Sequence, residues 1–331
     1  MANYRYSVFL LLAGLLSGRP AASQVSLYQS VNAFQTGSYA EALGMPLHVV
    51  LPEPLREPEL SKTYKKPDAR AGYLAEIAAE RTALEAAAKH WHLSPVSVVT
   101  AEEARNFELD KQATHLMLGM GTAPVTKYQG NGREYVYQFP ALRVYLLGHT
   151  GSSRYLLRKS PITSLLLYYQ LYYPFDQRRW PEIYPPTELV AAVQQLQAYM
   201  QQRAKDLSPR DIKRAAEAHL GQSAALLPTK TLLLAREQLA KSLPESKLAK
   251  LYPYPVQLTD RAGLDAAIAS ASPQHVYIRY VTIESENGYQ LLNAGSGQVL
   301  GYSDFHGSRR DEIGQVQDDD LKQLVKTATK N

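Results

Sequence analysis

The chain contains no cysteine among its 331 residues. This excludes disulfide bonds, thiolate zinc sites, iron–sulfur clusters and a cysteine nucleophile, so packing alone must stabilise the fold. Charge is also modest, with 20% charged residues, 45% hydrophobic residues and a net charge of +5. These values predict a folded globular protein, and the weak basicity gives no reason to expect a nucleic-acid partner.

Long apolar runs are scarce, and the clearest one lies in residues 1–23, MANYRYSVFLLLAGLLSGRPAAS. Arg5 precedes an apolar stretch from Val8 to Leu16, and the small residues Ala21 and Ser23 suit cleavage before Gln24. We therefore predict a signal peptide at 1–23 and an exported protein, periplasmic or extracellular, with no transmembrane segment after its removal. A buried N-terminal helix is the alternative. Without Arg5 and Arg19 the net charge is about 5 − 2 = +3.

Two stretches of the remaining chain share one pattern of strands and helices. PVSVVT begins at Pro95 and a strand opens at His115, and PVQLT begins at Pro255 and a strand opens at His275, so both intervals are 20 residues. Each stretch then predicts a hairpin with a glycine-containing tip, HTGSS at 149–153 and NAGSG at 293–297. We predict a duplicated α/β unit with mixed sheets and terminal hairpins. The alternative is two unrelated α/β stretches built from the same common elements.

These patterns divide the chain into a first α/β unit at 24–158, a helical connector at 159–228 and a second α/β unit at 229–331 that ends in a helix. In the first unit we predict an exposed loop at 52–67 and a helix from Asp68 to about His92. Ser160 and Pro161 predict a helix start in the connector. A long helix is predicted at 187–206, and Ser208 and Pro209 predict the start of another helix that ends near Gly221. In the second unit, residues 236–251 have a helical pattern that Pro244 interrupts.

Two phrases, KTLLLARE at 230–237 and LLNAGSGQVLGY at 291–302, resemble those of uncharacterised secreted proteins of Bacteroidota-type bacteria. The order of helix, strand, helix, strand and hairpin also resembles the N-terminal α/β domain of the periplasmic protein TolB. The resemblance implies an envelope protein that contacts other macromolecules, and it carries over no functional residue.

No motif predicts a catalytic or metal site. GMGTAP at 119–124 lacks the third glycine and the following helix of a dinucleotide fingerprint. A GxSxG elbow is missing from the sequence, and His90, Trp91 and His92 have the spacing of a helix end rather than of a metal site. We therefore predict no cofactor and no metal, and more readily a binding protein than an enzyme.

An aromatic segment at 168–184 is the candidate interaction site. The chain holds 23 tyrosines, and tyrosine, tryptophan and arginine are the residues that most often anchor protein interfaces. The candidate residues are Tyr168, Tyr169, Tyr172, Tyr173, Arg178, Arg179, Trp180 and Tyr184. The alternative is that these rings fill the seam between the two units.

The predicted function is therefore a non-enzymatic exported protein that binds an envelope protein or scaffolds an envelope assembly. A protein that binds a small molecule or glycan in a cleft between the units is the second interpretation. An enzyme without a recognisable motif is the third.

Overall fold

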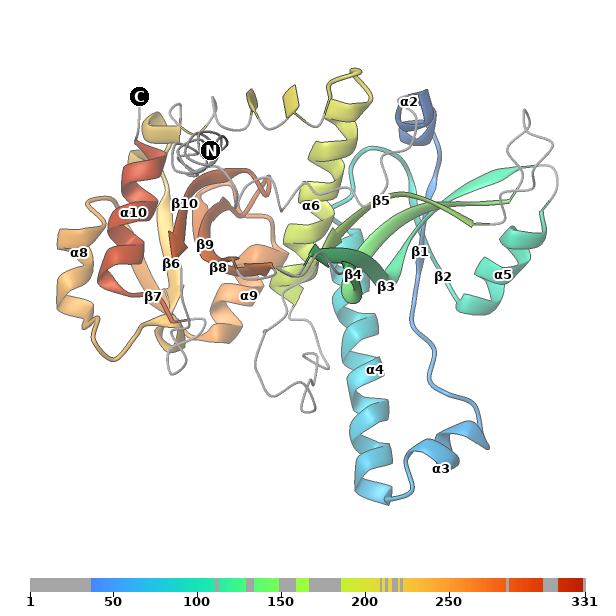
Figure 1. The fold of residues 1–331 in the computed structure, drawn as a ribbon. Helices are drawn as coiled ribbons and strands as arrows, with labels where there is room; N and C mark the ends of the chain where they lie inside the picture. The colour runs from blue at the N-terminus through green and yellow to red at the C-terminus, as the bar shows by residue number, and fades with distance from the viewer. Residues whose placement is uncertain are drawn as a thin grey trace, which may run out of the picture.

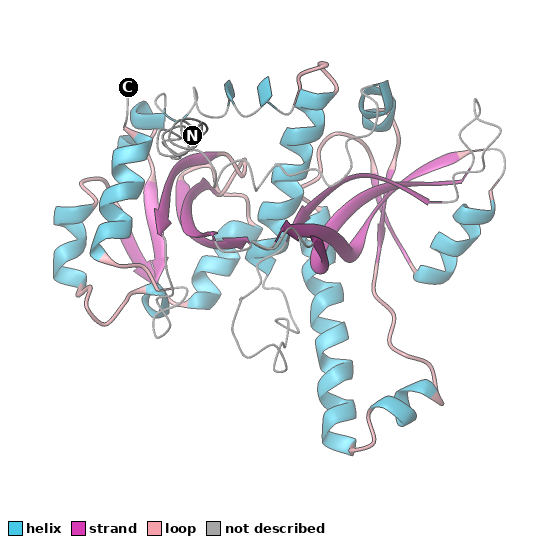
Figure 2. Ribbon diagram, in the orientation of Figure 1, coloured by secondary structure: helices cyan, strands magenta, loops and turns pink. Residues whose placement is uncertain are grey.

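The computed structural model describes residues 37–110, 113–128, 134–148, 159–166, 186–208, 210–211, 214–215, 220, 223–283, 286–305 and 315–329. The predicted signal peptide and the aromatic segment at 168–184 lie outside these residues. The described chain forms an α/β fold with two mixed five-stranded sheets, as the sequence predicts (Figures 1 and 2).

The first sheet has the order β2-β1-β3-β4-β5. Its strands are β1 (Leu47–Val50), β2 (Val96–Val99), β3 (Thr114–Tyr128), β4 (Glu134–Gly148) and β5 (Lys159–Leu166). β1 pairs in parallel with β2 and β3, and β4 is antiparallel to β3 and β5. The helices that precede and connect these strands are α2 (Gly37–Leu43), α3 (Glu59–Thr63), α4 (Pro67–Ala88) and α5 (Ala101–Leu109).

The second sheet repeats this topology in the order β7-β6-β8-β9-β10. Its strands are β6 (Thr231–Ala235), β7 (Val256–Thr259), β8 (His275–Ile283), β9 (Glu286–Asn293) and β10 (Val299–Phe305). β6 is parallel to β7 and β8, and β9 is antiparallel to β8 and β10. The remaining helices are α6 (Pro186–Arg203), α8 (Leu248–Leu251), α9 (Arg261–Ala269) and α10 (Asp318–Ala328).

The register shows that the repeat extends to individual residues. Leu47 lies opposite Val96 and Leu116, and Leu232 lies opposite Val256 and Val276. The Leu47 amide donates to the Pro95 carbonyl at 2.8 Å, and the Leu232 amide donates to the Pro255 carbonyl at the same distance. The prediction of two α/β units with the same pattern of strands is therefore confirmed in strand order and register.

Equivalent side chains also cap the equivalent helices α5 and α9. Thr100 accepts a hydrogen bond from the Glu103 amide and forms a capping box with the Glu103 side chain. Asp260 accepts from the Gly263 amide at 2.8 Å. These bonds satisfy amides that the first turn of a helix leaves without a partner, and in both units only the capping residue separates the strand from the helix.

The two units stack in layers, and α6 lies between the two sheets (Figure 1). α6 contacts β4, β5 and α4 of the first unit and α9 of the second, and its Leu189, Val190 and Val193 are completely buried. One hydrophobic cluster includes these residues, Leu47 and Val49 of β1, and Tyr277 and Leu292 of the second sheet. A second cluster lies between the second sheet and α10. α10 contacts β9, β10 and α8, so it covers the second sheet as α6 covers the first.

Three predictions about local structure are wrong. The predicted loop at 52–67 contains the five-residue helix α3. Residues 159–166 form strand β5 rather than starting a helix, and Pro161 pairs with Tyr145 beside a register shift in this edge strand, a position that tolerates proline. Residues 236–251 form two short 3₁₀ turns and the four-residue α8 instead of a helix with one interruption. Leu239 forms a parallel bridge with Val316, which holds this segment extended after its first turn.

Candidate interaction site

The eight candidate residues from Tyr168 to Tyr184 lie outside the described residues, so their interface role stays a prediction. The hairpin tip HTGSS lies outside them as well. Within the described residues, a projection from the first unit is instead largely exposed. The sequence did not indicate this projection as a site.

This projection, here called the arm, comprises residues 52–82: the chain after β1, α3 and the first part of α4 (Figure 1). Only Leu60 is buried between residues 52 and 82, whereas Ala83, Leu84, Ala87 and Ala88 at the end of α4 join the core. At 1.5 Å per residue, the part of α4 before Ala83 extends roughly 24 Å from the core. The arm is therefore anchored at one end, and apart from Leu60 its residues are exposed or half-buried.

Side-chain contacts fasten α3 to α4 and give the arm a defined shape. The Tyr64 and Tyr73 rings stack with centroids 4.5 Å apart, and the Tyr73 hydroxyl accepts a hydrogen bond from the Leu55 amide at 3.0 Å. Arg70 of α4 forms an ion pair with Glu57 before α3. Pro67 begins α4 at a position that suits its fixed backbone angle and lost N–H.

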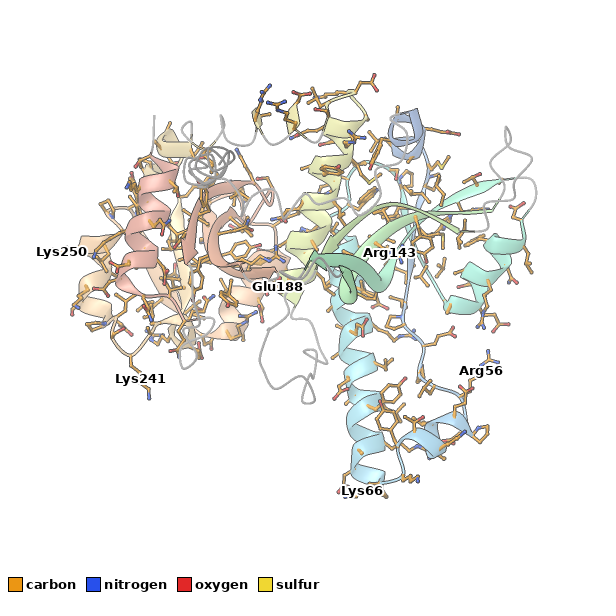
Figure 3. The ribbon with its side chains drawn as sticks, viewed as in Figure 1. Arg56, Lys66, Arg143, Glu188, Lys241 and Lys250 are labelled. Carbon is orange, nitrogen blue, oxygen red and sulfur yellow. The ribbon has the colours of Figure 1, made fainter. Side chains whose placement is uncertain are left out.

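The tip of the arm carries cations without ion-pair partners. Arg56, Lys62, Lys65 and Lys66 are exposed, and none of them forms an ion pair with a described residue. Figure 3 shows Lys66 at the far end of the arm and Arg56 on its side. These cations give the tip a positive surface next to Glu59 and Asp68, which form no ion pair with a described residue.

Exposed apolar side chains also concentrate on the first unit. Leu55 and Leu74 on the arm are 36% and 39% exposed, and Val96 and Val98 on β2 are 36% and 46% exposed. Leu109 at the end of α5 and Leu226 before the second unit are exposed as well. Within the described residues, the second unit has no exposed large apolar side chain, so the two units differ in the surface that they offer to a partner.

A histidine cluster lies under α5, on the other face of the first sheet. The Phe107 ring packs against His48 and His115, with centroids 4.7 and 4.3 Å away. His48 Nδ1 lies 2.7 Å from Ser97 Oγ, and His115 Nε2 lies 3.0 Å from Asp110 Oδ2. Burial lowers the pKa of His48 below its ordinary value, and the charge of His115 lowers it further. His48 is therefore neutral at pH 7.

His115 and His275 open equivalent strands, as their spacing predicts, but their surroundings differ. His275 Nδ1 has no hydrogen-bond partner among the described residues, whereas His115 lies beside Asp110. His90 at the end of α4 is buried, which lowers its pKa, and the Trp91 indole donates to Ser94 Oγ. The described residues contain no group of three or more side chains placed to bind a metal ion.

The space between the two sheets is filled by α6 and bridged by its polar side chains. Gln197 donates to the His90 carbonyl of the first unit at 2.7 Å, and Gln194 donates to the Ala294 carbonyl of the second at 3.1 Å. Gly297, in the NAGSG tip, has φ +67° and lies so close to α6 that a Cβ there would be 2.5 Å from Gln194 Cβ. The described residues therefore offer no support for a ligand cleft between the units.

One ion pair at this junction is almost completely buried. Arg279 Nη2 of β8 lies 2.6 Å from Glu188 Oε2 of α6, and their side chains are 2% and 12% exposed. Figure 3 places Glu188 where α6 approaches the second unit. Burial raises the pKa of the neighbouring Tyr277, so its hydroxyl stays protonated. The contacts of α6 therefore join the two units with little exposed surface between them.

GMGTAP lies within β3, where no helix follows and no phosphate-binding turn forms. No described helix combines the length and apolar character that a bilayer crossing requires.

Comparisons of the chain with models of protein families, with curated proteins and with solved structures find no match. The arm and the exposed valines of β2 are thus the parts of the described surface most suited to contact a partner.

Proposed function

We propose that this chain is an exported, non-enzymatic protein that binds an acidic protein partner through the arm of its first unit. The observation that carries the proposal is an arm held in shape by its own contacts, with exposed leucines along its side and cations at its tip that form no ion pair with a described residue. A carboxylate-bearing surface complements Lys62, Lys65 and Lys66, while apolar side chains of the partner cover Leu55 and Leu74.

The body of the protein supports this role because α6 and its hydrogen bonds join the two units into one layered support for the arm. A rigid support lowers the ordering cost of binding, since fewer rotamers and segments must be fixed when a partner arrives. The aromatic residues at 168–184 remain a second predicted contact region, argued from their sequence alone.

Export is part of the same proposal and rests on the apolar stretch Val8–Leu16 and the small residues before Gln24. The N-terminal sequence of the protein isolated from producing cells tests it. We expect the isolated chain to begin at Gln24, and a chain that still begins at Met1 would contradict the export step alone.

The binding role is tested with a photo-crosslinking residue placed either at Lys66 on the arm or at Lys250 on α8. Both lysines are exposed, and Figure 3 shows them at opposite ends of the molecule. We expect a crosslinked protein partner from position 66 and none from position 250. Crosslinking from position 250 alone would contradict the assignment of the arm.

The partner identified in this way is then purified, and its affinity is measured for the double variants K62E/K66E and K241E/K250E. The two variants change the net charge equally, but only the first alters the arm. We expect roughly tenfold weaker binding for the arm variant, equivalent to about 1.4 kcal/mol, and weaker binding of the unaltered protein at higher salt. Equal losses for both variants would show that only net charge matters.

A further inference from the structure

The outer edge of β2 offers backbone groups as well as exposed side chains. The Leu47 amide donates to the Pro95 carbonyl, and the Leu51 amide donates to the Val99 carbonyl at 3.0 Å. These bonds place the odd-numbered backbone groups of β2 toward β1. Since backbone groups alternate along a strand, the N–H and C=O of Val96 and Val98 point to the opposite, open edge.

Nothing in the described chain covers this edge. The first sheet ends at β2, and no described residue forms a hydrogen bond with the backbone groups of Val96 or Val98. Their side chains stand on the face that Leu47 and Val49 share, but outside the hydrophobic clusters. An edge with free backbone groups and exposed valines is a template for another strand.

In the second unit, the positions equivalent to Val96 and Val98 are covered by side chains of the core. By register, Val256 and Leu258 of β7 are the equivalents of Val96 and Val98. Both are only partly exposed, because they pack against the cluster that contains Leu243, Leu248 and Tyr252 from the β6–β7 connection. In the first unit the corresponding connection leaves the body as the arm, so the exposure of β2 is a consequence of the arm.

We infer that the β2 edge binds an extended apolar segment of the protein partner, which pairs with Val96 and Val98 and adds a strand to the first sheet. The inference rests on the proposed function and names the part of the partner that is recognised. Backbone pairing supplies affinity, and apolar side chains on alternate residues of the segment cover the two valines.

The position of the arm favours a partner segment over a second copy of this chain. The arm begins just beyond Leu51, and Glu53 accepts a hydrogen bond from the Ala101 amide that follows β2. A segment along β2 therefore continues directly onto the arm. Pairing of two four-residue β2 strands would bury far less than the roughly 1,200–2,000 Å² of a stable interface.

The test uses the full chain and a peptide with the sequence of Met45–Pro52, MPLHVVLP, which copies the strand that already pairs with β2. A control peptide carries N-methyl groups on alternate residues and cannot donate along its pairing edge. We expect saturable changes in the amide NMR signals of Val96 and Val98 with the parent peptide, and at least tenfold weaker binding of the control. Equal binding of both peptides, or changes confined to other residues, would overturn the inference.

Two variants of Val98 separate backbone pairing from side-chain contact. V98P removes the outward N–H at an edge position that tolerates proline, and V98T keeps this donor and the branched shape. We expect peptide binding to be lost in V98P and reduced less than threefold in V98T. Unchanged binding to V98P, with the amide spectrum of the second unit intact, would refute strand addition.

Two further outcomes separate this inference from the proposed function. If the same signals shift with protein concentration alone and sedimentation shows a dimer, a second copy occupies the edge and the inference is wrong. If the peptide fails while position 66 still crosslinks a partner, the arm function stands and only the strand addition is lost. If the peptide binds but position 66 crosslinks nothing, the arm proposal fails instead.

Discussion

The two units share strand order, register and capping positions, yet they use the connection between their first two strands differently. In the second unit this connection, residues 236–255, contributes Ala240, Leu243, Leu248 and Tyr252 to the core. In the first unit it is more than twice as long, and residues 52–82 leave the core as the arm. The same topology thus has a covered edge strand in the second unit and an exposed edge strand in the first.

The largest expected effect concerns the ion pair between Arg279 of the second unit and Glu188 of α6, for which the first unit has Gly119 in the place of Arg279. E188A leaves the Arg279 guanidinium buried without its carboxylate, which costs about 3–5 kcal/mol of unfolding free energy. Urea denaturation measures this loss. The double variant E188A/R279M should recover much of it, and a single variant as stable as the parent would show that the pair is solvated.

A smaller loss of unfolding free energy is expected at position 258 of β7, and almost none at the equivalent position 98 of β2. L258T removes apolar contacts with the second core and should cost about 1–2 kcal/mol, whereas V98T changes an exposed side chain and should cost less than about 0.5 kcal/mol. Thermal denaturation of both variants provides the comparison. Equal costs would mean that the β2 edge is covered in solution, contrary to the contrast between the units.

The third comparison concerns pH, because Leu233 of β6 occupies the place that His48 holds in β1. The folded pKa of His48 lies below its unfolded value near 6.5, so the unfolded chain binds more protons as pH falls through that value. Protonation of His48 should therefore lower the free energy of unfolding as the pH falls from 7 to 5.

H48L, which copies the second unit, should flatten this dependence when unfolding is measured across that range. S97A is the matched control, because it removes the hydroxyl beside His48 but keeps the imidazole. A profile as steep in H48L as in the parent chain would assign the acid sensitivity to other groups.

The smallest expected effect is confined to the arm. Y73F removes the hydroxyl that accepts from the Leu55 amide, so hydrogen exchange at Leu55 should become faster. Global stability should change by less than about 0.5 kcal/mol, because the arm contributes few buried residues. A large global loss would place the arm within the cooperative core, and unchanged exchange at Leu55 would show that this bond does not form.

The sequence predicted the repeat well because the intervals from Pro95 to His115 and from Pro255 to His275 are equal, and each holds the strand, helix and next strand of one crossover. It failed at Ser160 and Pro161, where a local cap pattern competes with pairing to β4, a contact distant in the sequence. It also failed between residues 236 and 251, where the bridge from Leu239 to Val316 overrides helical periodicity. Local preference is a weak guide wherever distant residues decide the pairing.

The arm was missed for a related reason. The sequence predicts a helix that includes Tyr73, Leu74 and Ile77, and apolar residues at that spacing indicate a face packed on a core. In the structure Tyr73 packs on Tyr64 of the arm itself, and Leu74 stays exposed. Periodicity identifies the apolar side of a helix, but it does not distinguish a core from a small local contact or from an open binding surface.

The face of α10 that points away from the second sheet determines whether a further sheet could stack on it. α6 buries nearly all its side chains because a sheet lies on each side of it, whereas α10 presents Asp319, Lys322 and Lys326 to water. Lys322 and Asp319 pair across that surface at 2.9 Å. A third sheet packed on this face would remove the water that hydrates these charges, which is unfavourable. The polar face of α10 therefore prevents further stacking of sheets, as the polar end repeats of solenoid proteins do.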